Sequence, residues 1–84
     1  MKISVRTFDL GTNEEKARKV CEEAAEFYAA HYCQGTRGTE ELMMEIGDLF
    51  TILANYCSAK GIEAQHCVDL AETKNILRGR YDSI

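Results

Sequence analysis

The chain has no proline and no tryptophan among its 84 residues, and only 8% of its residues are aromatic. Because proline is the strongest helix breaker, its absence leaves nothing to forbid long uninterrupted helices. No stretch approaches the roughly 20 apolar residues that a membrane-spanning helix needs. Residues 1–10 contain no apolar run of the length found in secretory signals. We therefore expect a cytoplasmic protein that does not span a membrane.

A Cys-x-x-Cys pair is also missing, although the chain has four cysteines. Their spacing fits no compact set of zinc ligands. Reduced thiols that fill helix-packing positions are the expectation for Cys21, Cys33, Cys57 and Cys67.

The small length limits the core. A chain of this size buries only about 60% of the surface that its unfolded form exposes. The hydrophobic fraction of 45% is large for such a chain, so we expect apolar surface to be buried against another subunit. The net charge of −4 argues against general binding to nucleic-acid polymers or to anionic membranes.

The pattern predicts an all-α fold, a small bundle in a single domain over residues 1–84. Its helices should cover about residues 13–33, 40–60 and 63–80, preceded by an extended arm over residues 1–11. Thr12 is a candidate N-cap, and Thr12-x-x-Glu15 has the spacing of a capping box. Thr39 is the N-cap candidate of the second helix, and Gly61 should end that helix.

Drawn at 100° per residue, each of the first two helices shows one broad apolar arc. The first apolar arc consists of Ala17, Val20, Cys21, Ala24, Phe27, Tyr28 and His31. The second apolar arc consists of Leu42, Met43, Ile46, Leu49, Phe50, Leu53, Tyr56 and Cys57. If the helices pack through these arcs, the residues along their margins should meet.

Carboxylates form a stripe along one margin of each arc. Glu23 and Glu26 lie on the first stripe, with Glu22 further toward solvent, and Glu45 and Asp48 lie on the second. The three-residue spacing puts each pair on one helix face. A solvated acidic face is the alternative for either stripe alone. Carboxylates that share a small volume repel one another unless a cation lies between them, which favours a hard divalent ion such as Mg²⁺.

This arrangement resembles the MazG-like family of all-α nucleotide pyrophosphohydrolases. The family pattern is a lysine, Glu-Glu-x-x-Glu, a spacer, Glu-x-x-Asp and a basic end. Here it begins at Lys19 and continues through Glu22, Glu23, Glu26, Glu45 and Asp48, and the resemblance covers about residues 12–82. Gly47 and Asn55 also fit the family pattern. Gly79 departs from it, because the family often continues its last helix at this point.

The resemblance implies hydrolysis of a (deoxy)nucleoside triphosphate to the monophosphate and pyrophosphate, as in house-cleaning of the nucleotide pool. It implies Mg²⁺, with Mn²⁺ as a possible substitute, bound by Glu23, Glu26, Glu45 and Asp48. The catalytic carboxylates would be Glu22 and Glu23, although Glu22 is equally well a solvated neighbour. The substrate-binding residues would be Lys19, Asn55, Lys74, Arg78 and Arg80.

Some of these roles have alternatives. Lys19 either contacts phosphate or balances the acidic residues, and Asn55 is a candidate for contact with sugar or base. The basic residues near the end of the chain suit the triphosphate, or form an ordinary basic helix C-terminus. By resemblance, a homodimer or homotetramer completes the site.

Three other functions fit parts of the pattern. A phosphoribosyl-ATP pyrophosphohydrolase shares the acidic residues, but it typically has Ala-Asp where this chain has Gly47-Asp48. A di-iron bundle is suggested by Glu63-x-x-His66, but such sites need a second Glu-x-x-His, which is missing. A non-catalytic helical interaction module would use the acidic stripes to bind a basic partner.

Overall fold

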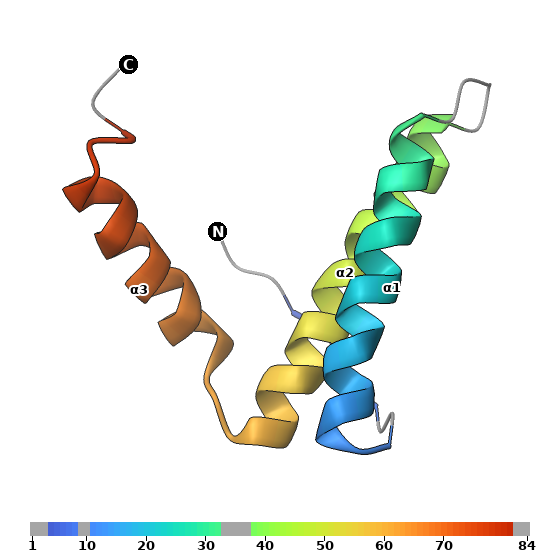
Figure 1. Ribbon diagram of the computed structural model, residues 1–84, viewed down its shortest axis with the longest axis horizontal. Coiled ribbons are helices and arrows are strands. Elements are labelled where there is room, and N and C mark those ends of the chain that lie inside the picture. The colour runs from blue at the N-terminus through green and yellow to red at the C-terminus, as the bar shows by residue number, and fades with distance from the viewer. Residues whose placement is uncertain (1–3, 9–10, 33–37, 82–84) are drawn as a thin grey trace.

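A computed structural model describes residues 4–8, 11–32 and 38–81. These residues form three α-helices and no strand. The helices are α1 (Asn13–His31), α2 (Gly38–Lys60) and α3 (Ala64–Leu77), shown in Figure 1. The predicted all-α fold is confirmed. Cys33, which was expected in the first helix, lies outside the described residues.

The prediction that Thr12 is the N-cap of α1 is confirmed. The Thr12 hydroxyl accepts a hydrogen bond of 3.1 Å from the backbone N–H of Glu15, which satisfies one of the donors that a helix start leaves unpaired. The prediction for α2 is wrong by two residues. Gly38 already has helical geometry there, so Thr39 is the second residue of the helix instead of its N-cap.

A Schellman motif ends α2 at the predicted glycine. The N–H of Gly61 donates to the carbonyl of Ser58 (3.2 Å), and the N–H of Ile62 donates to the carbonyl of Cys57 (2.8 Å). Gly61 has φ = 67°, a left-handed conformation that glycine adopts without steric strain.

A second Schellman motif ends α3 earlier than the sequence predicted. Gly79 has φ = 70°, its N–H donates to Ile76, and the N–H of Arg80 donates to Asn75. The helix therefore ends at Leu77 instead of near residue 80, because the glycine turns the backbone out of the helix.

The two longer helices, α1 and α2, run antiparallel and pack along their length, as Figure 1 shows. The apolar arcs pack only in part, since Phe27 and Leu49 are half-buried, and the contact is centred on the margins of the arcs, where the acidic stripes lie. Glu23 of α1 and Ile52 and Asn55 of α2 are buried there, whereas Met43 and Phe50 of the second apolar arc are 66% and 43% exposed. A helix that is apolar around much of its circumference has more than one face that can pack.

The third helix extends away from this hairpin (Figure 1) and makes little contact with α1 or α2. Every residue of α3 is exposed except Asn75, which is half-buried. The radius of gyration is 15.0 Å, against about 12 Å for a compact domain of this length. A single chain therefore leaves one of its three helices without a packing partner among the described residues.

The described part of the arm, residues 4–8, contains neither helix nor strand. It is joined to α2 by the backbone N–H of Phe8, which donates to Asn55 Oδ1 (2.9 Å). Within the described ranges, no helix has both the length and the hydrophobicity to cross a membrane.

Candidate metal centre

Three carboxylates from two helices converge where α1 and α2 pack together. Glu23 of α1, and Glu45 and Asp48 of α2, each place one carboxylate oxygen within 4.8 Å of the others. The convergence follows from the packing, because the acidic stripes themselves form the contact between the helices. The structure thus brings together three of the four predicted metal ligands.

Two oxygens of this cluster are buried without a hydrogen-bond partner among the described residues. They are Glu23 Oε2 and Glu45 Oε2. Glu23 as a whole is only 7% exposed. A buried carboxylate oxygen that lacks a donor or a cation destabilises the fold, since it has lost its hydration without compensation. Both oxygens can accept a cation.

The raised pKa of Glu23 also indicates a carboxyl group that lacks a compensating positive charge. Burial raises the pKa of its carboxyl, and the neighbouring Glu26 carboxyl raises the pKa further. Lys19 opposes this change but does not cancel it. In the metal-free protein Glu23 therefore holds its proton more tightly than an ordinary glutamate does. Glu26, the fourth predicted ligand, is exposed and contacts the cluster through Glu23.

Lys19 is the cation placed beside these carboxylates. Its Nζ lies 3.2 Å from Glu22 Oε2 and 3.4 Å from Glu23 Oε1. The hydrogen bond to Glu22 is the main cause that raises the pKa of Lys19. Glu22 and Lys19 thus form an exposed ion pair at the edge of the cluster. One ammonium group facing several carboxylates leaves the cluster with an excess of negative charge.

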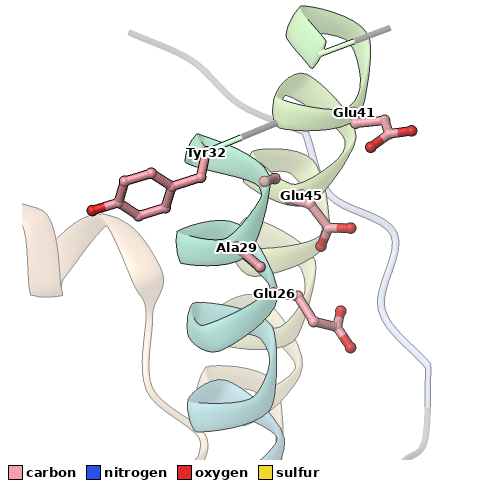
Figure 2. A pocket seen from close by; sticks show the side chains of 6 residues that line it. Glu26, Ala29, Tyr32, Glu41 and Glu45 are labelled. Atoms are coloured by element: carbon pink, nitrogen blue, oxygen red, sulfur yellow. The ribbon is translucent and has the colours of Figure 1, made fainter. Parts of the chain in front are cut away.

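A hollow of about 370 Å³ adjoins the cluster. Figure 2 shows the side chains of Glu26, Glu41 and Glu45 pointing to the same side of the helix pair, while the Tyr32 ring points away from them. Glu41 was not among the predicted site residues. The available signal was its position on the stripe, one turn before Glu45.

Asn55 lies deeper in the hairpin than its predicted role in substrate binding suggested. It is only 2% exposed, its Oδ1 accepts the bond from Phe8, and its Nδ2 has no partner among the described residues. A second hollow, of about 300 Å³, is lined by Thr7, Phe8, Lys16, Asn55, Ser58 and Ala59. In this chain Asn55 holds the arm and lines the hollow beside it.

The basic residues predicted to bind phosphate lie elsewhere in the chain. Lys74 is on α3, Arg78 and Arg80 follow that helix, and all three are exposed. Because α3 extends away from the hairpin, one chain does not bring them to the carboxylates.

Comparison of this chain with protein-family models, with curated proteins and with solved structures finds no match. The functional argument therefore depends on the chemistry of the site. Carboxylate oxygens are the ligands preferred by hard divalent cations, and the two unpaired buried oxygens fit such an ion.

Proposed function

We propose that this protein is a Mg²⁺-dependent nucleoside triphosphate pyrophosphohydrolase that removes (deoxy)nucleotides from the cytoplasmic pool. The observation that carries the proposal is the convergence of Glu23, Glu45 and Asp48 within 4.8 Å, with two buried oxygens that lack a partner among the described residues. The type of reaction is inferred from the resemblance of the acidic pattern to the MazG-like family.

The ligand set suits a hard cation that also binds phosphate. Mg²⁺ is typically bound by one or two carboxylates together with water and substrate phosphates, and Mn²⁺ accepts the same oxygen ligands. When bound, the cation neutralises charge on phosphate oxygens and makes a water molecule more acidic. Glu23, Glu45 and Asp48 would hold it, and Glu26, outside this group of three, neighbours Glu23.

The neighbouring residues have the chemistry that hydrolysis needs. Glu22 has a side chain that is 54% exposed and can orient a water molecule or accept its proton. Lys19, held between Glu22 and Glu23, balances part of the negative charge and keeps Glu22 beside the cluster. The hollow next to Glu26 and Glu45 has the size of a small-molecule site, so part of a nucleotide fits there.

A second copy of the chain would complete this site. The chain exposes 6789 Å², about 1,700 Å² more than a compact monomer of 9.5 kDa. Two chains that bury this excess would form an interface of about 3,400 Å², a size typical of permanent dimers. In a dimer or tetramer the partner's α3 can bring its basic residues, Lys74, Arg78 and Arg80, to the phosphates.

The test is a panel of standard and modified (d)NTPs incubated with Mg²⁺, with pyrophosphate release as the readout. We expect release of pyrophosphate together with the nucleoside monophosphate, and none after chelation of the metal. A helical interaction module without catalytic function would release no pyrophosphate from any nucleotide.

Replacing Asp48 by asparagine keeps its size and removes its charge. We expect Asp48→Asn to lower turnover more than about a hundredfold, since even the second-shell partners of a metal typically matter by about 10–100-fold. Helicity and assembly should be unchanged. Asp69→Asn on α3 is the matched control, because Asp69 is exposed and outside the cluster. Equal activity of Asp48→Asn and Asp69→Asn would remove Asp48 from the metal site.

A further inference from the structure

The hollow beside the arm lies apart from the acidic cluster. It is lined by residues of the arm, of α1 and of α2, namely Thr7, Phe8, Lys16, Asn55, Ser58 and Ala59. Asn55 follows Asp48 by seven residues on α2, which is two helical turns or about 10 Å. Lys16 precedes Glu23 by the same interval on the antiparallel α1, toward the same end of the hairpin. This hollow and the one beside Glu45 share no lining residue.

Asn55 contributes a buried hydrogen-bond donor to the lining. The side chain is only 2% exposed, and its Oδ1 accepts the 2.9 Å hydrogen bond from the backbone N–H of Phe8. Its Nδ2 has no partner within the described ranges. A buried donor without an acceptor destabilises the fold, because it has lost its hydrogen bonds to water. A ligand oxygen that accepts a hydrogen bond from Nδ2 would remove this destabilisation.

Of the six described residues that line the hollow, one is charged, and it is the cation Lys16. Lys16 lies in the first turns of α1 and is 8% exposed. Its Nζ donates a hydrogen bond to the carbonyl of Gly11, which precedes the helix. The ammonium group therefore lies near the positive end of the helix dipole, where anions are favoured. Glu14 and Glu15 of the same helix turn are exposed and do not line the hollow.

We propose that the hollow beside the arm binds a phosphate group, as the free ion or as a small phosphomonoester. This inference is independent of the proposed hydrolase function. All three segments around the hollow carry hydrogen-bond donors, which are the Thr7 hydroxyl, Lys16 Nζ, Asn55 Nδ2 and the Ser58 hydroxyl. A tetrahedral phosphate offers oxygens in several directions, whereas a carboxylate has two oxygens in one plane. A bound phosphate would connect the arm to both helices.

Calorimetric titration of the metal-free chain, residues 1–84, tests the proposal. Metal is first removed by chelation and desalting, so that phosphate cannot bind to an ion at the acidic cluster. Inorganic phosphate, glycerol 3-phosphate and acetate are titrated separately at constant ionic strength. We expect one phosphate site per chain, and the tighter of the two phosphate ligands identifies the free ion or the monoester. No binding of either ligand, or equally tight binding of acetate, would overturn the proposal.

Variants of the lining residues locate the site. Lys16→Met removes the charge at similar length, and Asn55→Asp keeps an oxygen for the arm but replaces the Nδ2 donor. Each should weaken phosphate binding about tenfold or more, the effect of losing a hydrogen bond to a charged group. Lys60→Met is the matched control, because Lys60 is exposed at the end of α2 and outside the hollow. Wild-type affinity in Lys16→Met would overturn the proposal, even if Asn55→Asp did not fold.

Hydrogen exchange of the arm provides a measurement on the wild type alone. The backbone N–H of Phe8 is bonded to Asn55, so it exchanges when the arm opens. If phosphate connects the arm to the helices, this exchange should slow about tenfold at a phosphate concentration of roughly ten times the Kd. The amide of Val68 on α3 should be unaffected, because α3 lies away from the hollow. Phosphate binding without any change at Phe8 would place the ion elsewhere and overturn the proposal.

Discussion

At Glu23 the requirements of folding and of metal binding conflict. Its carboxylate is almost fully buried between two helices, next to Glu26, and one of its oxygens has no partner among the described residues. Such a group destabilises the metal-free protein, and a bound cation would remove this destabilisation by pairing with the buried charge. The site thus makes the stability of the fold depend on metal.

The stability of the metal-free protein should fall as the pH rises. The folded-state pKa of Glu23 is raised above its unfolded value of 4.5, so its contribution is fully present below that value and is lost as the pH passes the folded pKa. Glu23→Gln removes this loss. We expect the variant to be more stable than the wild type by roughly 1 kcal/mol at neutral pH, and by less in acid. Urea unfolding at several pH values, with a chelator present, measures the difference.

The control for this experiment is Glu22→Gln, because Glu22 contacts the same lysine but remains exposed. Added Mg²⁺ should stabilise the wild type and the control, but not Glu23→Gln. If Mg²⁺ stabilised all three proteins equally, Glu23 would not be a ligand. If Glu22→Gln showed the same pH dependence as Glu23→Gln, burial would not be its cause.

At the scale of the helices, local chemistry was predictable and the packing was not. Thr12 and Gly61 mark helix ends correctly because capping depends on a few neighbouring residues. The stripes were identified from helical periodicity, and the structure brings Glu23 and Asp48 together. The packing face was predicted only in part, because periodicity shows which residues avoid water but not whether the same chain or another one covers them.

Two glycines of similar surroundings give opposite predictions for the same substitution. A Cβ at Gly47, inside α2, or at Gly61, just after α2, would meet no atom within 4 Å. Gly47→Ala should therefore stabilise the chain by roughly 1 kcal/mol, because alanine favours the helix. Gly61→Ala should destabilise it by about 1 kcal/mol, because alanine is strained at φ = 67°. Urea unfolding of the metal-free variants measures both values.

Each variant serves as the control for the other, since the volume added is the same. A Gly61→Ala variant at least as stable as the wild type would contradict the account of the helix end. A destabilising Gly47→Ala would show that another surface lies against α2 at this position, which the single chain leaves open.

At the scale of the whole molecule, the exposed apolar surface requires a partner. Ile52 is the one buried hydrophobic residue among those the structure describes, while residues of the second apolar arc such as Phe50 and Leu53 are more than 40% exposed. The apolar face of α2 and the unpacked α3 lie on the same chain. In a dimer, α3 of one copy can therefore cover the apolar face of α2 in the other copy, and the reverse.

Stability should therefore depend on protein concentration. In an obligate oligomer the folded state is favoured by mass action, so we expect the midpoint of thermal unfolding to rise with concentration. Phe50→Glu puts a charge in the second apolar arc and should abolish this dependence, with a shift from oligomer to monomer in light scattering. Ser58→Glu adds the same charge on an exposed, polar part of α2 and should leave the mass of the oligomer unchanged.

A monomeric wild type with a midpoint of unfolding independent of concentration would contradict the assembly. Pyrophosphate release by such a monomer would show that one chain completes the site.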